Sequence, residues 1–177
     1  LNLFGISFNK NILRGREIIE KFHPSFAHIE NLDLYKENIS SEDCSYLNNL
    51  SELEDLINHQ DVDIIVCAIS GFAGLKATYI AASSGKKILL ANKESIVSGG
   101  DLIIPLAKEN NSEIIPIDSE HNAIFQCLSG EKGVEDVQKI SITASGGPFL
   151  NTSISDLKDV TVKEALNHPN WKMGNKV

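Results

Sequence analysis

The stretch that organises this chain covers residues 114–126, which read IIPIDSEHNAIFQ. An apolar run stops there at two carboxylates, a hydroxyl and an imidazole, and a helix-like pattern follows. Residues two apart at the end of a strand project to the same side, so we expect Asp118 and Glu120 to converge on one point. Two hard oxygen ligands at the carboxyl end of a buried strand suit Mg²⁺ or Mn²⁺. The alternative is structural: Asp118 or Ser119 caps the helix that follows, near its positive end.

Strand and helix patterns alternate on both sides of this stretch. Residues 63–68 form a continuous apolar run typical of a strand buried on both faces, and strands are also predicted at 87–90 and 113–117. Helical spacing or capping motifs predict helices over 12–22, 51–58, 75–83, 102–108 and 121–128. Further strand patterns occur at 1–6, 26–29 and 139–144. Short connections between alternating strands and helices predict an α/β fold with a doubly wound parallel sheet.

The glycine loop with which such sheets bind dinucleotides is missing from the sequence. The pattern Gly-x-Gly-x-x-Gly does not occur, and Gly71 with Gly74 does not supply it. The only methionine is Met173, so Leu1 is not a natural start. We therefore expect an internal piece of a longer protein, in which a first strand and the glycine loop precede Leu1.

The composition limits the class of protein. Of the 177 residues, 42% are hydrophobic and 23% charged, which is ordinary for a globular protein. A net charge of -8 argues against nucleic acid or an acidic membrane surface as the main partner, although a local cluster of donors can still bind a small anion. Three cysteines without metal spacing, no membrane span and no signal peptide favour a cytoplasmic protein.

Polar clusters follow two further strands. Asn92, Lys93 and Glu94 come directly after the strand at 87–90, where the lysine is either a cation for a substrate oxygen or an exposed residue at a helix start. Ser145 with the two glycines after it resembles an anion-binding turn, and a plain turn is the alternative. His168 and Trp171 flank Pro169 in a polar loop, where the tryptophan is either a core anchor or part of a lid over a ligand.

Taken together, these stretches closely resemble the 1-deoxy-D-xylulose 5-phosphate reductoisomerase family. The segments that carry the resemblance are LLANKES (89–95), PIDSEHNAIFQ (116–126), ASGGPF (144–149) and HPNWKMG (168–174). They occur in the family's order, and the resemblance covers essentially the whole chain. It implies a truncated Rossmann-like sheet followed by the start of an α+β catalytic domain. The implied division is a partial NADPH-binding domain over 1–112 and a partial metal- and substrate-binding domain over 113–177.

The resemblance also implies roles for the clustered residues. Asp118 and Glu120 look like two of the three carboxylates that hold Mg²⁺ or Mn²⁺. Six residues are implied to contact the substrate, either to position it or to close over it. They are Lys93, Ser119, Glu120, Ser145, His168 and Trp171. The implied cofactor contacts are Asn9, Lys10, Asn11, Asn92, Glu94 and Gly174. Asn9 is a departure, since the family usually has Gly-Lys-Asn beside the adenosine 2′-phosphate, but Asn tolerates a left-handed backbone better than most residues.

The implied reaction converts a sugar phosphate, 1-deoxy-D-xylulose 5-phosphate, to 2-C-methyl-D-erythritol 4-phosphate. The metal acts as a Lewis acid while the carbon skeleton rearranges, and NADPH then reduces the aldehyde intermediate. The resemblance further implies a homodimer, in a bacterial cytoplasm or a plastid. We expect the 177-residue chain alone to bind NADPH and metal poorly and to be inactive. The alternatives are another NADPH-dependent dehydrogenase, or a non-catalytic module that binds a nucleotide or sugar phosphate.

Overall fold

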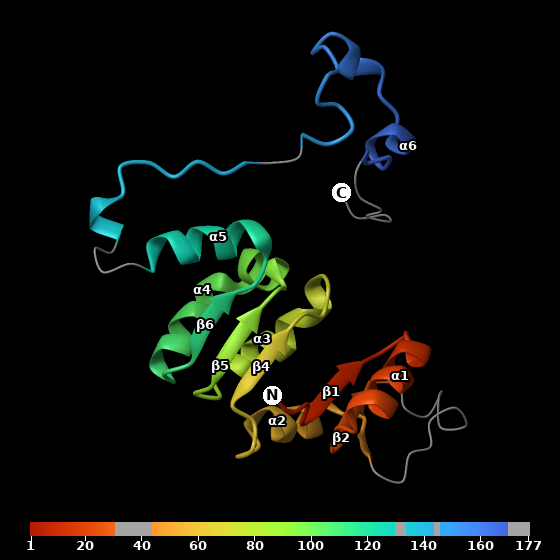
Figure 1. Cartoon of the computed structure of the whole chain (residues 1–177), viewed down its shortest axis with the longest axis vertical. Coiled ribbons are helices and arrows are strands. Elements are labelled where there is room, and N and C mark those ends of the chain that lie inside the picture. Colours follow the sequence, from red (N-terminus) through yellow and green to blue (C-terminus); the bar gives the residue numbers. More distant parts are fainter. Residues whose placement is uncertain (31–43, 130–133, 144–145, 170–177) are drawn as a thin grey trace. The chain divides into compact units, whose positions relative to one another are not determined.

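The computed structural model describes residues 1–30, 44–129, 134–143 and 146–169. The chain divides into two compact units, Leu1–Gly130 and Glu131–Val177. Within the described ranges, no helix is both long enough and apolar enough to cross a membrane. The first unit contains two parallel sheets and the helices that pack on them (Figure 1).

The first sheet has the order β1-β2-β3, with β1 at Gly5–Phe8, β2 at Phe26–Ile29 and β3 at Ser45–Leu47. Helix α1 (Ile12–Phe22) packs on it through Ile12 and Ile19, which join the core with Ala27 and Ile29. Gly15 is required in this helix because a Cβ there would lie 2.4 Å from the Phe8 ring. The strand predicted at 1–6 begins later than its apolar pattern, at Gly5.

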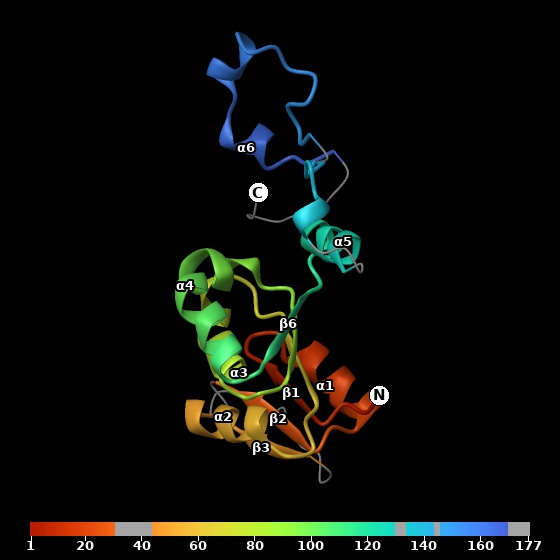
Figure 2. The same ribbon diagram turned by 90° about the vertical axis from the view of Figure 1, so that its left-hand side faces the viewer.

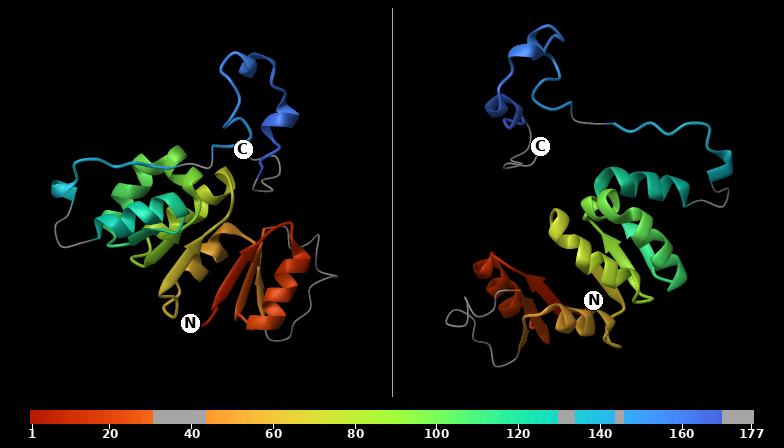
Figure 3. Two further views of the ribbon diagram at one scale, coloured as in Figure 1. Left: turned by 45° about the horizontal axis from the view of Figure 1, so that its top comes forward. Right: turned by 180° about the vertical axis from the view of Figure 1, so that it is seen from behind.

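The second sheet has the order β4-β5-β6, with β4 at Ile64–Cys67, β5 at Lys87–Leu90 and β6 at Glu113–Pro116. Helices α3 (Leu75–Ala82) and α4 (Lys93–Glu109) lie together on one side of these strands, as Figures 2 and 3 show. Ile88 of β5 and Ile103 of α4 are fully buried between the layers. This sheet and its helices therefore form the parallel α/β arrangement that the sequence predicts.

Only one face of β4 is covered, whereas its continuous apolar run predicts burial on both faces. Ile65 and Cys67 pack into the core with the helices, while Ile64 and Val66 on the other face are 39% and 59% exposed. The prediction of burial on both faces is wrong for these residues. Alternate side chains of a strand point to opposite faces, and the core lies on one of them.

The two sheets are separate, where the sequence predicts a single sheet. Among the described residues, β1 pairs only with β2, and β4 only with β5. Helix α2 (Leu50–Asn58) connects the two halves, since Leu53 and Ile57 enter the core of the second sheet and Leu56 lies against Gly5 beside the first. The α/β class with parallel strands is confirmed.

Local capping corrects several predicted boundaries. Helix α2 begins with Asn49, whose side chain forms a capping box with Glu52, and not with Ser51. Helix α4 begins at Lys93 and continues through a kink at Gly99, so it starts well before residue 102. Strand β3 lies in a region whose polar sequence predicts no element.

The second unit holds short elements in its described residues. They are 3₁₀ turns at Val134–Asp136 and Asp156–Asp159, and helix α6 (Val162–Ala165), which opens with a capping box of Thr161 and Glu164. The strand predicted at 139–144 is not formed over 139–143, and residue 144 lies outside the described residues. Ile140 and Ile142 are 52% and 66% exposed. A strand requires a partner for its backbone groups, and these residues have none within the described part of the unit.

Candidate functional site

The candidate site is built at the carboxyl end of β6, where helix α5 (Ser119–Leu128) begins. Asp118 is the residue that precedes the helix, and Glu120 lies in its first turn. The Asn122 side chain donates to the Pro116 carbonyl at 2.7 Å, and the Asn122 backbone donates to the Asp118 carbonyl at 2.8 Å. The two carboxylates therefore belong to a helix start fixed by Asn122, and not to the end of a strand as their spacing predicts.

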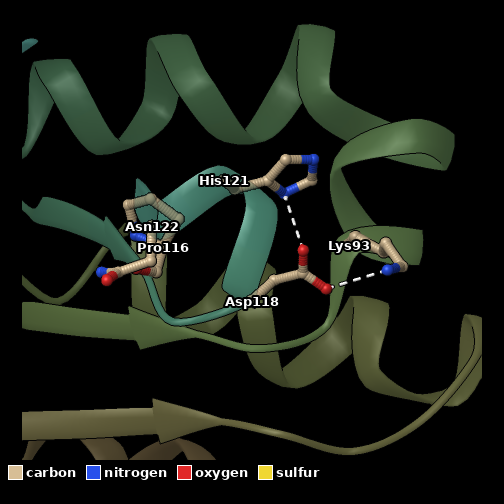
Figure 4. A network of polar contacts seen from close by, with 5 residues as sticks. All are labelled: Lys93, Pro116, Asp118, His121 and Asn122. Atoms are coloured by element: carbon tan, nitrogen blue, oxygen red, sulfur yellow. Dashed lines mark hydrogen bonds and ion pairs between the residues drawn. The ribbon is translucent and has the colours of Figure 1, made fainter. Parts of the chain in front are cut away.

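The Asp118 carboxylate is held between two basic side chains (Figure 4). Its Oδ2 accepts a hydrogen bond from Lys93 Nζ at 2.8 Å, and its Oδ1 lies 3.6 Å from His121 Nδ1. The Asp118 side chain is 15% exposed, whereas those of Lys93 and His121 are 47% and 53% exposed. Side chains that follow β5 and β6 thus meet at one point, as parallel strands allow.

Asp118 does not cap helix α5 with its side chain, which was the structural alternative for this position. Its Oδ1 is instead a buried carboxylate oxygen without a hydrogen-bond partner among the described residues. Buried polar atoms are nearly always paired, and a carboxylate oxygen is a ligand that Mg²⁺ and Mn²⁺ accept. This oxygen therefore fits a role as a ligand to a divalent cation.

Charge coupling ties Lys93 and Asp118 together. The hydrogen bond from Lys93 lowers the pKa of Asp118, although burial of the carboxyl opposes the shift. The same hydrogen bond raises the pKa of Lys93, and the charges of Glu120 and Glu94 add to that effect. Both shifts favour the ionised forms of Lys93 and Asp118, which together make an ion pair at neutral pH.

The described residues do not complete a metal site by themselves. Within them, no group of three or more His, Cys, Asp or Glu side chains is placed to hold a metal ion. Asp118 and the exposed Glu120 remain the two predicted ligands. Mg²⁺ is usually bound by one or two carboxylates together with water and substrate oxygens, so this pair is compatible with it.

The residues around Lys93 lie at the start of α4. Asn92 caps this helix and is 2% exposed, and Glu94 lies in its first turn. Ser119, the exposed first residue of α5, stands between the two carboxylates in the sequence, and its predicted role stays a prediction. The structure thus brings Asn92, Lys93 and Asp118 together through adjacent strands β5 and β6.

A second polar cluster follows β1 in the other sheet. Asn11 caps α1 by accepting from the Arg14 backbone at 3.2 Å, and Lys10 is exposed. Asn9, at the family's glycine position, donates from Nδ2 to Glu30 Oε2 at 3.2 Å. Glu30 was not predicted from the sequence, where its only signal is its place directly after strand β2, the neighbour of β1.

Four predicted site residues lie in the second unit or outside the described residues. Ser145, Trp171 and Gly174 lie outside the described residues. His168 is half-buried in the second unit, shortly after α6. Their predicted roles therefore stay predictions. Asn122 was also missed from the sequence, where its only signal is its place four residues after Asp118, at the spacing of one helical turn.

Comparisons with known proteins agree with the motifs. A family model described as 1-deoxy-D-xylulose 5-phosphate reductoisomerase matches residues 1–100, and a model of the C-terminal domain of the same enzyme matches residues 114–177. The reductoisomerase of Francisella tularensis subsp. novicida is 45% identical over 179 residues, which cover 99% of this chain and 46% of that protein. The chain thus spans about half the length of the curated relatives it matches.

Solved structures show the same likeness. The reductoisomerase from Zymomonas mobilis, in complex with NADPH, matches with a TM-score of 0.83 and 37% identity over 94% of this chain and 44% of that one. A structure of DOX-P reductoisomerase in complex with NADPH, fosmidomycin and magnesium matches with a TM-score of 0.78 and 37% identity, covering 97% and 45%. Because one family model alone matches more than half of its residues, this chain belongs to the 1-deoxy-D-xylulose 5-phosphate reductoisomerase family.

Proposed function

We propose that this chain is part of an enzyme that uses NADPH and a divalent cation to convert 1-deoxy-D-xylulose 5-phosphate to 2-C-methyl-D-erythritol 4-phosphate. The observation that supports this most directly is the buried Asp118 Oδ1, which has no hydrogen-bond partner in the described chain and belongs to the carboxylate that Lys93 binds. Family membership supports the substrate, and relatives solved with NADPH and magnesium support the cofactors.

Asp118 and Glu120 would hold Mg²⁺ or Mn²⁺, which supplies Lewis-acid polarisation of substrate oxygens when bound. Lys93 has its cationic Nζ 2.8 Å from Asp118, so it can bind an anionic or hydroxyl oxygen of the substrate at the same point. Ser119 and Glu120, at the start of α5, would orient that substrate. Ser145, His168 and Trp171 would bind the substrate and exclude water, as the family resemblance implies.

The adenosine end of NADPH would lie at the loop of Asn9, Lys10 and Asn11, where the lysine would meet the 2′-phosphate. Asn92, Glu94 and Gly174 would also contact the cofactor. We propose residues 1–112 as the NADPH-binding domain and 113–177 as the start of the catalytic domain. The assembled enzyme would be a cytoplasmic homodimer. For the 177-residue chain by itself, we propose weak binding of NADPH and metal and no turnover.

A metal titration tests the site on this chain. We expect Mn²⁺, followed by water proton relaxation, to bind weakly to the native chain and at least about tenfold more weakly to Asp118→Asn, which removes a charged ligand. Asp101→Asn removes the same charge from an exposed position on α4 and should leave Mn²⁺ affinity unchanged. Equal affinity of the Asp118→Asn and native chains would remove the main support for the proposal.

A turnover assay separates this function from its alternatives. Oxidation of NADPH should require both 1-deoxy-D-xylulose 5-phosphate and Mg²⁺ or Mn²⁺ in the longer protein that contains this chain. Metal-independent oxidation would indicate a different dehydrogenase, and cofactor binding without any reaction would indicate a binding module. Turnover by the 177-residue chain alone would contradict the proposed need for further residues.

A further inference from the structure

Asn92 has no side-chain hydrogen-bonding group left for a ligand. Its Nδ2 donates to the carbonyls of Ile69 and Gly71, the latter at 2.9 Å. Its Oδ1 accepts from the backbone N–H of Ser95 at 2.7 Å and from the Ser95 hydroxyl. An asparagine amide offers two N–H donors and one oxygen, and all three are used inside the protein. The residue is 2% exposed, so its side chain is also out of reach of solvent.

The turn whose carbonyls accept from the Asn92 amide contains two glycines that leave room for it. This turn follows β4 and contains Gly71, at φ 72, and Gly74. A Cβ on Gly74 would lie 2.5 Å from the Ile69 carbonyl oxygen and 2.7 Å from Asn92 Nδ2, so only glycine allows the amide to approach. The two glycines that resemble part of a phosphate loop therefore make room for an asparagine side chain.

A buried network continues behind Asn92. The Thr78 hydroxyl lies 2.9 Å from the Gly74 carbonyl and 3.3 Å from the Ser95 hydroxyl, and both Thr78 and Ser95 are 0% exposed. The network joins the turn after β4, helix α3 and the first turn of α4. The single Thr78 proton is shared between these two acceptors, since the Ser95 proton goes to Asn92, and buried hydrogen bonds of this kind hold the elements that they join in place.

We propose that Asn92 is a positioning residue: it locks the turn after β4 to the start of α4 and thereby sets Lys93 against Asp118. Lys93 is the next residue, and its backbone direction is fixed because Asn92 is the helix cap. The predicted cofactor contact of Asn92 would then be made by its backbone, since the side-chain groups are used inside the protein. That Lys93 binds the substrate rests on the proposed function. That Asn92 positions Lys93 rests on the hydrogen bonds described above.

The experiment follows the ammonium group of Lys93 by NMR in the chain labelled with ¹⁵N-lysine. In Asn92→Ala and Ser95→Ala, we expect exchange of the Lys93 ammonium protons with water to accelerate about 2–5-fold, as an exposed ion pair is loosened. Ser98→Ala alters an exposed serine of the same helix and should leave the exchange rate unchanged. Lys108, also on α4, serves as the internal reference.

If the hydrogen bonds of Asn92 only stabilise the fold and do not position Lys93, the variants should behave differently. In that case the variants would lower the urea midpoint but leave the Lys93 exchange rate of the folded chain unchanged, which would overturn the proposal. If Asn92→Ala does not fold, the proposal is tested with Ser95→Ala and with two substitutions of Thr78. Thr78→Ser keeps the hydroxyl and should retain native exchange, whereas Thr78→Val should accelerate it. These rates are measured without Mn²⁺, so the positioning role of Asn92 and the proposed metal site can fail separately.

Discussion

The runs at β4, β5 and β6 in the first unit, and the run at 139–143 in the second, are all rich in β-branched and aliphatic residues. The first three lie in register and pair as parallel strands, and Ile88 at their centre is fully buried. The last lies unpaired within the described residues, with Ile142 66% exposed. The difference shows that an apolar pattern specifies which residues can form a strand, while the available partners decide whether the strand forms.

The largest difference between the units should appear in core truncations. We expect Ile88→Ala to lower the free energy of unfolding by about 2–5 kcal/mol, because it leaves a cavity in a closely packed layer. Ile142→Ala should cost less than about 0.5 kcal/mol, because that side chain is exposed. Urea unfolding followed by circular dichroism measures both. A cost for Ile142→Ala close to that of Ile88→Ala would show that residues 139–143 are buried in solution.

Glycine substitutions should give the next largest decrease in the free energy of unfolding. A Cβ at Gly15 would lie 2.4 Å from the Phe8 ring, so Gly15→Ala should cost about 1–3 kcal/mol by forcing α1 away from the first sheet. Gly147, at φ 63 in the second unit, has open space where a Cβ would stand, so a side chain there would meet backbone strain alone. We expect about 1 kcal/mol for Gly147→Ala. The same unfolding measurement applies, and reversal of the order would contradict the packing of α1.

A pH dependence should distinguish the first unit. Burial lowers the pKa of His28, whose ring shares hydrogen bonds with the Ser7 hydroxyl and the Asn49 carbonyl at 3.1 and 3.2 Å. Because its folded pKa lies below the unfolded value of about 6.5, folding favours the neutral ring. Its stabilising contribution is therefore present above that value and is lost as the pH falls below it, by at most about 1.4 kcal/mol for each pH unit.

Urea midpoints measured between about pH 7.5 and pH 5 test this dependence, since the unfolded ring gains its proton in this range. His28→Gln should remove this part of the slope, while Ser7→Ala, which keeps the buried histidine, should retain it. An unchanged slope in His28→Gln would assign the acid sensitivity to other groups.

The smallest effect should be a change in nucleotide binding at residues 9–11, the loop after β1. Glu30 places a carboxylate beside Asn9, where the proposed function puts the 2′-phosphate. Glu30→Gln should therefore strengthen binding of adenosine 2′-monophosphate relative to adenosine by about threefold, as expected for one screened charge. NMR shifts of residues 9–11 report the binding. Glu20→Gln, on the exposed side of α1, is the charge-matched control. An equal gain in both variants would indicate net charge alone, and no shift at residues 9–11 would count against the nucleotide loop itself.

Much of the first unit follows from the sequence, and its exceptions have identifiable physical causes. Helix α1 has the predicted bounds because its apolar residues recur at helical spacing. Strand β5 has them because its short apolar run lies between Gly85 and the polar cluster that begins at Asn92. Helix α2 begins at Leu50 because Asn49 and Glu52 form the capping box that the Ser51 pattern was expected to supply. The start of α4 was missed because Gly99 and Gly100 read as a break, whereas the helix tolerates a kink there.

The candidate site was predictable in its residues but not in its geometry. Asp118 and Lys93 follow neighbouring strands, so their meeting could be inferred from the fold alone. Two other features could not be inferred: the buried Asp118 Oδ1 has no hydrogen bond among the described residues, and the Asn92 amide is fully used. Both depend on side-chain orientations that spacing does not determine. Glu30 was missed because its contact with Asn9 joins residues far apart in the sequence.

The kink at Gly99 divides α4 into two segments that make different contacts. The segment before it carries Lys93 and Ser95, whereas the segment after it is anchored by Ile103 and Ala107 in the core. Because the backbone departs from helical angles at Gly99, the two segments run in different directions and are held by different contacts. The direction of Lys93 is thus set by the hydrogen bonds at the start of α4, and the course of the rest of the helix is set by the core.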